Sequence, residues 1–211
     1  MVTIARYGIH DFALKSPTDH PNPFQVSLSA TFEHESGGTL EQVPGFYNDG
    51  NTFVIRFSPT LEGRWRGHTR SEDPALDGIE LEHVVCIPVQ DPTTHGGITV
   101  NPQHPHRFAW QDGRPFVYMG FECDWLFAYH QSNPEQCRKH IELIHDRGFN
   151  AIVMNVYAHT GFSTPGSRFE GDLPEEDVYG PPELYVFGGT NENPDHGQLN
   201  IAFFEDYDKM M

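Results

Sequence analysis

Two segments of the sequence each end an apolar run with carboxylate, amide and aromatic side chains. The segment GFECDW spans residues 120–125, and the segment RGFNAIVMNVYAH spans residues 147–159. The candidate binding residues at these two ends are Glu122, Asp124, Trp125, Asn155, Tyr157 and His159. Aromatic faces beside hydrogen-bonding carboxylate and amide groups are typical of a carbohydrate subsite. These residues therefore predict a site for a hydroxylated ligand.

A catalytic role for the two carboxylates is a separate question. Glu122 and Asp124 are two residues apart, so on a strand they share a face with Cα atoms about 6 to 7 Å apart. Glycoside hydrolysis needs carboxyl groups about 5 to 5.5 Å apart for retention and about 6.5 to 9.5 Å apart for inversion. Because nothing in the sequence places this pair across a scissile bond, no catalytic residue is assigned. A structural role, in packing or in satisfying strand-end backbone groups, stays open.

The elements that must position these residues form a predicted strand, helix and strand. Apolar residues 116–121 predict the first strand, and residues 149–159 predict the second. Between them, Asn133 can cap a helix that begins at Pro134 and ends at Gly148. Strands joined through such a helix are parallel, so their carboxyl ends meet at one rim of a sheet. Asn155, Tyr157 and His159 would then alternate on one face, because side chains on a strand repeat every two residues.

The first hundred residues predict an all-β sandwich. Short apolar segments alternate with turn signals at the spacing typical of this fold. The predicted strands lie within residues 24–34, 52–59, 63–71 and 80–90. In the first of them, alternate residues from Val26 to Phe32 share one face. The tetrapeptide from Asn48 to Asn51 predicts a tight turn, since Asn, Asp and Gly tolerate positive φ.

The segment 91–106 is rich in Pro, Gly and His and predicts the domain boundary. We therefore expect a sandwich over residues 1–100 and an α/β domain that contains the βαβ unit over residues 101–211. Directly after the boundary, Asp112 and Gly113 predict a hairpin turn. The polar segment of about 40 residues after His159 exceeds the usual connection of about 4 to 6 residues, which indicates a functional loop. A final helix should bury the face formed by Ile201, Phe204, Tyr207 and Met211.

The charge of the chain restricts its partners. Thirteen Lys and Arg residues against thirty Asp and Glu residues give a formal net charge of −17. This charge argues against nucleic acid and anionic membrane surfaces as partners, and favours a neutral polar ligand or a cation. The sequence has no apolar run long enough to cross a bilayer and no signal peptide, so we expect a cytoplasmic protein unless a leader was removed.

Cysteine and histidine spacing gives no clear metal or disulfide site. Cys86, Cys123 and Cys137 are odd in number and form no Cys-x-x-Cys pair. His95, His104 and His106 could bind a first-row metal, with the last two on one face. Scattered surface histidines are the commoner outcome, so we assign no metal and no cofactor.

Four segments resemble a family of bacterial glycoside-hydrolase-like proteins. They are NPFQVSLSATFEH, GFYNDGNTFVIRFSPTLEGRWRGHT, HGGITVNPQHPHRFAWQDGRPFVYMGFECDWLF and RGFNAIVMNVYAH. In that family an immunoglobulin-like β-sandwich, catalogued as a domain of unknown function, precedes a (β/α)₈ barrel of the apiosidase-like and cellulase-like kind. The resemblance implies an immunoglobulin-like sandwich over residues 1–100 and the first βα units of an incomplete α/β barrel over residues 101–211. It also implies hydrolysis of O-glycosyl bonds by the full-length protein, and a sugar-binding role for the six candidate residues.

The resemblance also implies that the catalytic residues lie beyond Met211. Related barrels place the acid/base after the fourth strand and the nucleophile after the seventh. A complete barrel takes about 250 residues, and only about 110 follow the predicted boundary. We therefore expect an inactive amino-terminal fragment that self-associates through the unpaired edge of its barrel sheet. The alternatives are a non-catalytic carbohydrate-binding or protein-interaction sandwich, and a small α/β metalloenzyme that uses the linker histidines.

Overall fold

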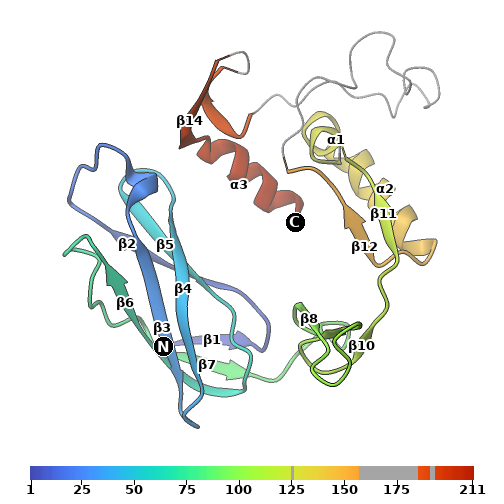
Figure 1. Cartoon of the computed structure of the whole chain (residues 1–211), viewed down its shortest axis with the longest axis horizontal. Helices are drawn as coiled ribbons and strands as arrows, with labels where there is room; N and C mark the ends of the chain where they lie inside the picture. The colour runs from blue at the N-terminus through green and yellow to red at the C-terminus, as the bar shows by residue number, and fades with distance from the viewer. Residues whose placement is uncertain (125, 157–184, 191–192) are drawn as a thin grey trace. The chain divides into compact units, whose positions relative to one another are not determined.

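The computed structural model describes residues 1–124, 126–156, 185–190 and 193–211 (Figure 1). The chain divides into two compact units, Met1–Val117 and Tyr118–Met211. Within the described residues, no helix is long and apolar enough to cross a membrane.

The first unit contains a seven-stranded sheet in the order β1-β7-β6-β3-β4-β5-β2. Its strands are β1 (Val2–Ala5), β2 (His10–Lys15), β3 (Leu28–His34), β4 (Thr39–Tyr47), β5 (Thr52–Phe57), β6 (Gly63–Ser71) and β7 (Val84–Ile87), and a short 3₁₀ helix, η1, spans Pro23–Gln25. Neighbouring strands are antiparallel except β1 and β7, which are parallel. The predicted segments all contain a strand, whereas β1, β2 and β4 were not predicted.

Strand β4 pairs with a different neighbour along each part of its length. Its first part pairs with β3, and its last three residues, Gly45 to Tyr47, pair with β5. The register between β3 and β4 shifts between Ala30 and Phe32, and Gln42 adopts a φ of +55°. Such a bulge bends a strand and increases its twist. The result is a β-sandwich-like unit with an enclosed core.

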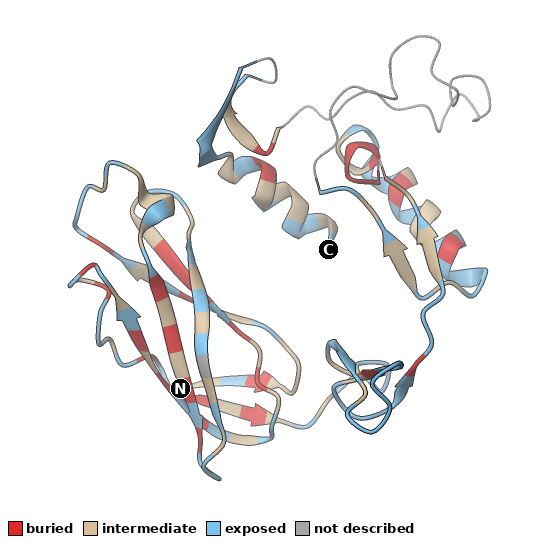
Figure 2. Cartoon of the chain, in the orientation of Figure 1, coloured by how far each residue is buried: buried red, intermediate tan, exposed pale blue. Residues whose placement is uncertain are grey.

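Aromatic side chains dominate that core. The rings of Phe32 and Phe57 stack with centroids 3.8 Å apart, and Trp65 meets Phe57 edge to face at 5.5 Å. Figure 2 shows the buried residues along the strands of this unit. The predicted alternation in β3 is confirmed, since Leu28, Ala30 and Phe32 are buried.

The predicted turns are also present. Asp49, Gly50 and Asn51 all have positive φ, which links β4 to β5. A second turn at Asp112 and Gly113 closes a hairpin, where Gly113 has a φ of +90° and donates a hydrogen bond from its N–H to the carbonyl of Trp110.

This hairpin belongs to a three-stranded antiparallel sheet. Its strands are β8 (Ile98–Val100), β9 (Phe108–Trp110) and β10 (Pro115–Phe116). The sheet groups with the first unit, so the division falls after Val117 and not near residue 100. The prediction of one strand over residues 116–121 was wrong. Phe116 pairs within the first unit and Gly120 begins a strand of the second, with exposed residues 117–119 between them.

The second unit contains the predicted strand, helix and strand. Its elements are β11 (Gly120–Glu122), α1 (Leu126–Ser132), α2 (Pro134–Asp146), β12 (Ala151–Val153), β13 (Phe187–Gly189), β14 (Pro194–Leu199) and α3 (Ile201–Met210). Strands β11 and β12 are parallel, which confirms the predicted pairing. In α2 the side chain of Asn133 accepts a hydrogen bond from the N–H of Gln136, and Gly148 follows the helix with a φ of +89°. Among the described residues of the second unit, β11 and β12 form the single parallel pair, and the strands form no complete barrel.

The buried face of helix α3 overlaps the predicted face but is centred on Phe203. Phe203 is its buried residue, and its ring meets Phe127 of α1 edge to face at 4.8 Å. Phe204, Tyr207 and Met210 also pack in this cluster, while Met211 is exposed. The prediction therefore included Phe204 and Tyr207 but missed Phe203, which packs against α1, a helix that was not predicted.

Candidate functional site

Three of the six predicted binding residues lie within the described part of the chain. Glu122 is the last residue of β11, Asp124 follows that strand, and Asn155 follows β12. Trp125, Tyr157 and His159 lie outside the described residues. The predicted strand over residues 149–159 is shorter, because β12 ends at Val153.

Backbone hydrogen bonds hold the two strand ends together. The N–H of Cys123 donates to the carbonyl of Val153 at 2.8 Å, and the N–H of Asn155 donates to the carbonyl of Asp124 at 3.3 Å. Asp124 and Asn155 are therefore adjacent through their backbones. The side chains of Glu122 and Asn155 are exposed, and Asp124 is partly buried. We call these three residues the strand-end rim. Its groups can accept hydrogen bonds through two carboxylates and both donate and accept through one amide.

An apolar cluster includes residues that neighbour the rim in the sequence. Leu126, Tyr129 and Cys137 are buried there, and Cys123 and Ile152 pack against them. Burial, and then the charge of Asp124, raise the pKa of the Cys123 thiol to about 11. Burial also raises the pKa of Cys137 to about 11. Neither thiol therefore supplies a thiolate nucleophile at neutral pH.

The linker histidines do not form a metal site within the described residues, where no group of three metal-binding side chains gathers. His104 and His106 are exposed. His95 lies 2.9 Å from Asp112 through Nδ1, and the guanidinium of Arg114 lies 3.3 Å from its Nε2. Because a guanidinium only donates, Nε2 accepts and Nδ1–H donates, so both ring nitrogens are in use.

A second polar cluster contains Ser16, His20 and Asp73, the residue types of a nucleophilic triad. The Ser16 hydroxyl donates to Asp73 Oδ2 at 2.5 Å, and His20 Nε2 lies 2.8 Å from the same oxygen. In a catalytic triad the imidazole accepts the hydroxyl proton, whereas here the carboxylate does. The hydrogen bond from Ser16, followed by those from the Ala75 N–H and His20, lowers the pKa of Asp73. This cluster therefore joins the end of β2 to the segment after β6 and is structural.

Comparison with known proteins gives two informative matches. The model of a family described as a domain of unknown function, DUF5060, matches residues 3–72. A crystal structure described as "a putative glycoside hydrolase from Bacteroides vulgatus" matches 99% of this chain with 26% sequence identity and a TM-score of 0.75. This chain spans 38% of the length of that protein.

The other comparisons add little. The Lin-41 filamin domain matches 40% of this chain and 82% of its own length, at 13% identity and a TM-score of 0.32. No curated protein matches. The resemblance inferred from the sequence is confirmed in its coarser form, because a domain of unknown function matches at the amino-terminal end and the match to the Bacteroides protein extends over both units.

Proposed function

We propose that this chain is the amino-terminal part of a carbohydrate-acting protein and that the strand-end rim binds sugar. The observation that carries this proposal is the match to the Bacteroides protein, which extends over 99% of the chain and includes β11 and β12. In open α/β sheets, ligands bind beyond the carboxyl ends of parallel strands. Glu122, Asp124 and Asn155 occupy such ends.

The roles of the rim residues follow from their chemistry. Sugar hydroxyls donate to carboxylate oxygens, which Glu122 and Asp124 provide, and the amide of Asn155 can bind a hydroxyl through either atom. Trp125, Tyr157 and His159 would add ring faces for the apolar side of a sugar. All six residues bind in this proposal, and none acts as acid, base or nucleophile.

The reaction of the whole protein is the finer part of the proposal. We infer hydrolysis of an O-glycosyl bond by a (β/α)₈ barrel, for which β11, α2 and β12 supply the opening unit and an immunoglobulin-like sandwich precedes it. The catalytic pair would then come from residues outside 1–211. The relative lengths of the two proteins support a catalytic pair outside residues 1–211, because this chain spans 38% of the length of the Bacteroides protein.

A glycan-binding measurement on this chain tests the proposal. The chain is screened against neutral oligosaccharides, and the best ligand is titrated against Glu122→Gln and Glu205→Gln. Both glutamates are exposed and lie in the same unit, but only Glu122 belongs to the rim. We expect Glu122→Gln to weaken binding about fivefold or more, and Glu205→Gln to leave it unchanged. Equal affinity of both variants, or binding of no glycan, would contradict the proposal.

A further inference from the structure

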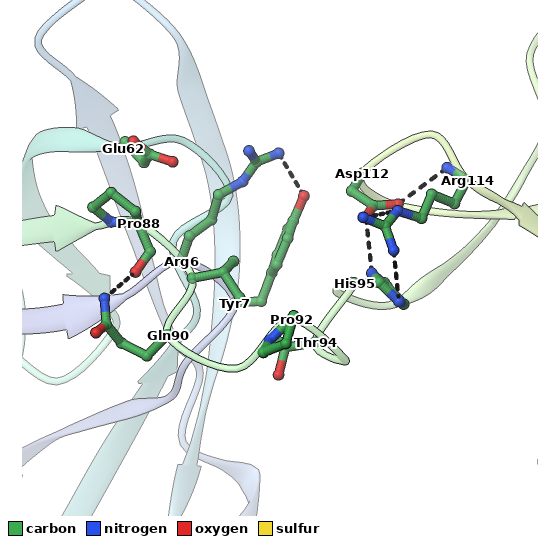
Figure 3. Close-up of a pocket in the computed structure, with 11 residues that line it drawn as sticks. Arg6, Tyr7, Glu62, Pro88, Gln90, Pro92, Thr94, His95, Asp112 and Arg114 are labelled. Carbon is green, nitrogen blue, oxygen red and sulfur yellow. Dashed lines mark hydrogen bonds and ion pairs between the residues drawn. The ribbon is translucent and has the colours of Figure 1, made fainter.

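The first unit contains a polar pocket that is separate from the strand-end rim. Its volume is about 410 Å³, within the range of about 300 to 1,000 Å³ that is usual for small-molecule sites. Residues from distant parts of the sequence line it, among them Arg6, Tyr7, Glu62, Gln90, His95 and Arg114 (Figure 3).

The pocket lies where the two parallel strands of the first unit end. The N–H of Arg6 donates to the carbonyl of Ile87 at 2.8 Å, which continues the pairing of β1 with β7. Tyr7 follows with a φ of +67°, a backbone conformation that is strained for a bulky residue. A Cβ added to Gly96 would lie 2.7 Å from two carbons of the Tyr7 ring, so this ring packs closely against the glycine. Strain of this kind is often kept at binding sites.

Arg6, which lines the pocket, has one N–H donor that makes no hydrogen bond to the described residues. Its guanidinium carbon lies 4.6 Å from the centre of the Tyr7 ring, and Nη2 donates to the Tyr7 hydroxyl. Its Nε atom is buried and makes no hydrogen bond to the described residues. Because a buried donor without an acceptor costs free energy, an oxygen from a ligand would stabilise it.

On another side of the pocket, hydrogen bonds hold the lining side chains in place. His95, Asp112 and Arg114 form the network described above, in which the Arg114 backbone N–H also donates to Asp112 Oδ1 at 3.0 Å (Figure 3). That hydrogen bond, followed by the one from His95, lowers the pKa of Asp112 and keeps it charged at neutral pH. The loop before His95 is held by Asp91, whose Oδ1 accepts from the N–H and the hydroxyl of Thr93.

The pocket is lined by equal numbers of positively and negatively charged side chains. Two guanidinium groups, Arg6 and Arg114, face two carboxylates, Glu62 and Asp112. Such a site offers donors and acceptors without net charge. A hydroxyl group fits it because it can both accept from a guanidinium and donate to a carboxylate.

We infer that this pocket binds a neutral polyhydroxylated ligand of sugar size, with an oxygen that accepts from Arg6 Nε–H. The choice of sugars among neutral polyols rests on the proposed function. The site itself does not, because it lies in the first unit and uses none of the rim residues.

The test is an NMR titration of the ¹⁵N-labelled chain with glucose, xylose, myo-inositol and glucuronate, each up to tens of millimolar. We expect saturable amide shifts at residues 6, 7, 89–91 and 93–95 with a neutral polyol, and weaker binding of glucuronate. No saturable shift at these residues with any neutral probe would overturn the inference, and so would a preference for glucuronate.

Matched variants separate this pocket from the rim. Arg6→Lys keeps the charge but removes the Nε–H donor, while Arg66→Lys makes the same change at an exposed position of β6 outside the pocket. We expect Arg6→Lys to weaken binding about tenfold and Arg66→Lys to leave it unchanged. Glu62→Gln, at an exposed residue, should also weaken binding and guards against a folding defect in Arg6→Lys.

The two proposals fail in different ways. Shifts confined to residues 122–155 would support the strand-end rim and refute this pocket. Shifts confined to the pocket, unaffected by Glu122→Gln, would support the inference and refute the proposed role of the rim.

Discussion

At the scale of single residues, Asp73 makes the first unit sensitive to acid. The hydrogen bond from Ser16, then those from Ala75 and His20, lower its pKa in the folded chain. The pKa of an Asp side chain in an unfolded chain is about 3.9. The stabilisation from this carboxylate is therefore complete above about pH 4, and it is lost as the pH falls through the lower folded pKa.

Asp73→Asn tests this linkage. We expect the variant to be less stable at neutral pH, and its free energy of unfolding to depend less on pH below about pH 4 than that of the wild type. Urea denaturation at a series of pH values measures both. Parallel acid dependence of the two proteins would show that Asp73 does not carry the effect.

The thiols provide a second residue-scale prediction. Because Cys123 and Cys137 both have a pKa of about 11, their thiolate fraction at pH 8 is about two hundredfold smaller than that of an ordinary thiol with a pKa of about 8.5, and alkylation should be slower to match. Unfolding in denaturant should restore the ordinary rate. Rapid labelling of Cys123 or Cys137 in the folded chain, located by mass spectrometry, would contradict the described burial.

At the scale of elements, Gly45 allows β4 to pass from one layer of the first unit to the other. A Cβ at this position would lie 2.6 Å from a Leu28 methyl carbon and 2.8 Å from one of Ile55. We expect Gly45→Ala to lower the free energy of unfolding by about 1 to 3 kcal/mol through overpacking. Gly38→Ala is the control, since the nearest atom to its Cβ would lie at 3.6 Å. Equal effects on the midpoint of denaturation would rule out this explanation.

The elements that the sequence predicts are those with a local signal. Alternation identifies β3, the Asn-Asp-Gly turn identifies the link from β4 to β5, and Asn133-Pro134 identifies the start of α2. Strands β1, β2 and β4 lack such a signal, because their place depends on partners distant in the sequence: Val2 pairs with Val84, and His10 with Phe57. The break between β10 and β11 is missed for the same reason.

The candidate sites, too, were predictable only where a local sequence signal exists. Parallel pairing of β11 with β12 was predictable, and it brings Asp124 and Asn155 together as expected. The pocket in the first unit was not predictable, because Arg6 and His95 belong to no shared motif and only folding brings them to one cavity. The positive φ of Tyr7 could not be read from the sequence either, since turns rarely place Tyr in that conformation.

At the scale of the whole molecule, the two units have separate cores. Phe57 is buried in the first, and Phe203 is buried in the second. We expect calorimetry to resolve two unfolding transitions. Phe57→Ala should lower the free energy of unfolding of the first unit only, and Phe203→Ala that of the second unit only, each by about 3 to 5 kcal/mol. A single transition shifted by both variants would show that the units unfold as one.

The most direct test of the central claim is calorimetric titration of Asn155→Ala with a neutral oligosaccharide that the wild-type chain binds. Asn155 is exposed and its side chain is not part of a core, so the fold should be retained. We expect binding to weaken by about 1 to 3 kcal/mol through lost hydrogen bonds, with an unchanged midpoint of thermal unfolding. Unchanged affinity in a folded Asn155→Ala variant would contradict a sugar site at the strand-end rim.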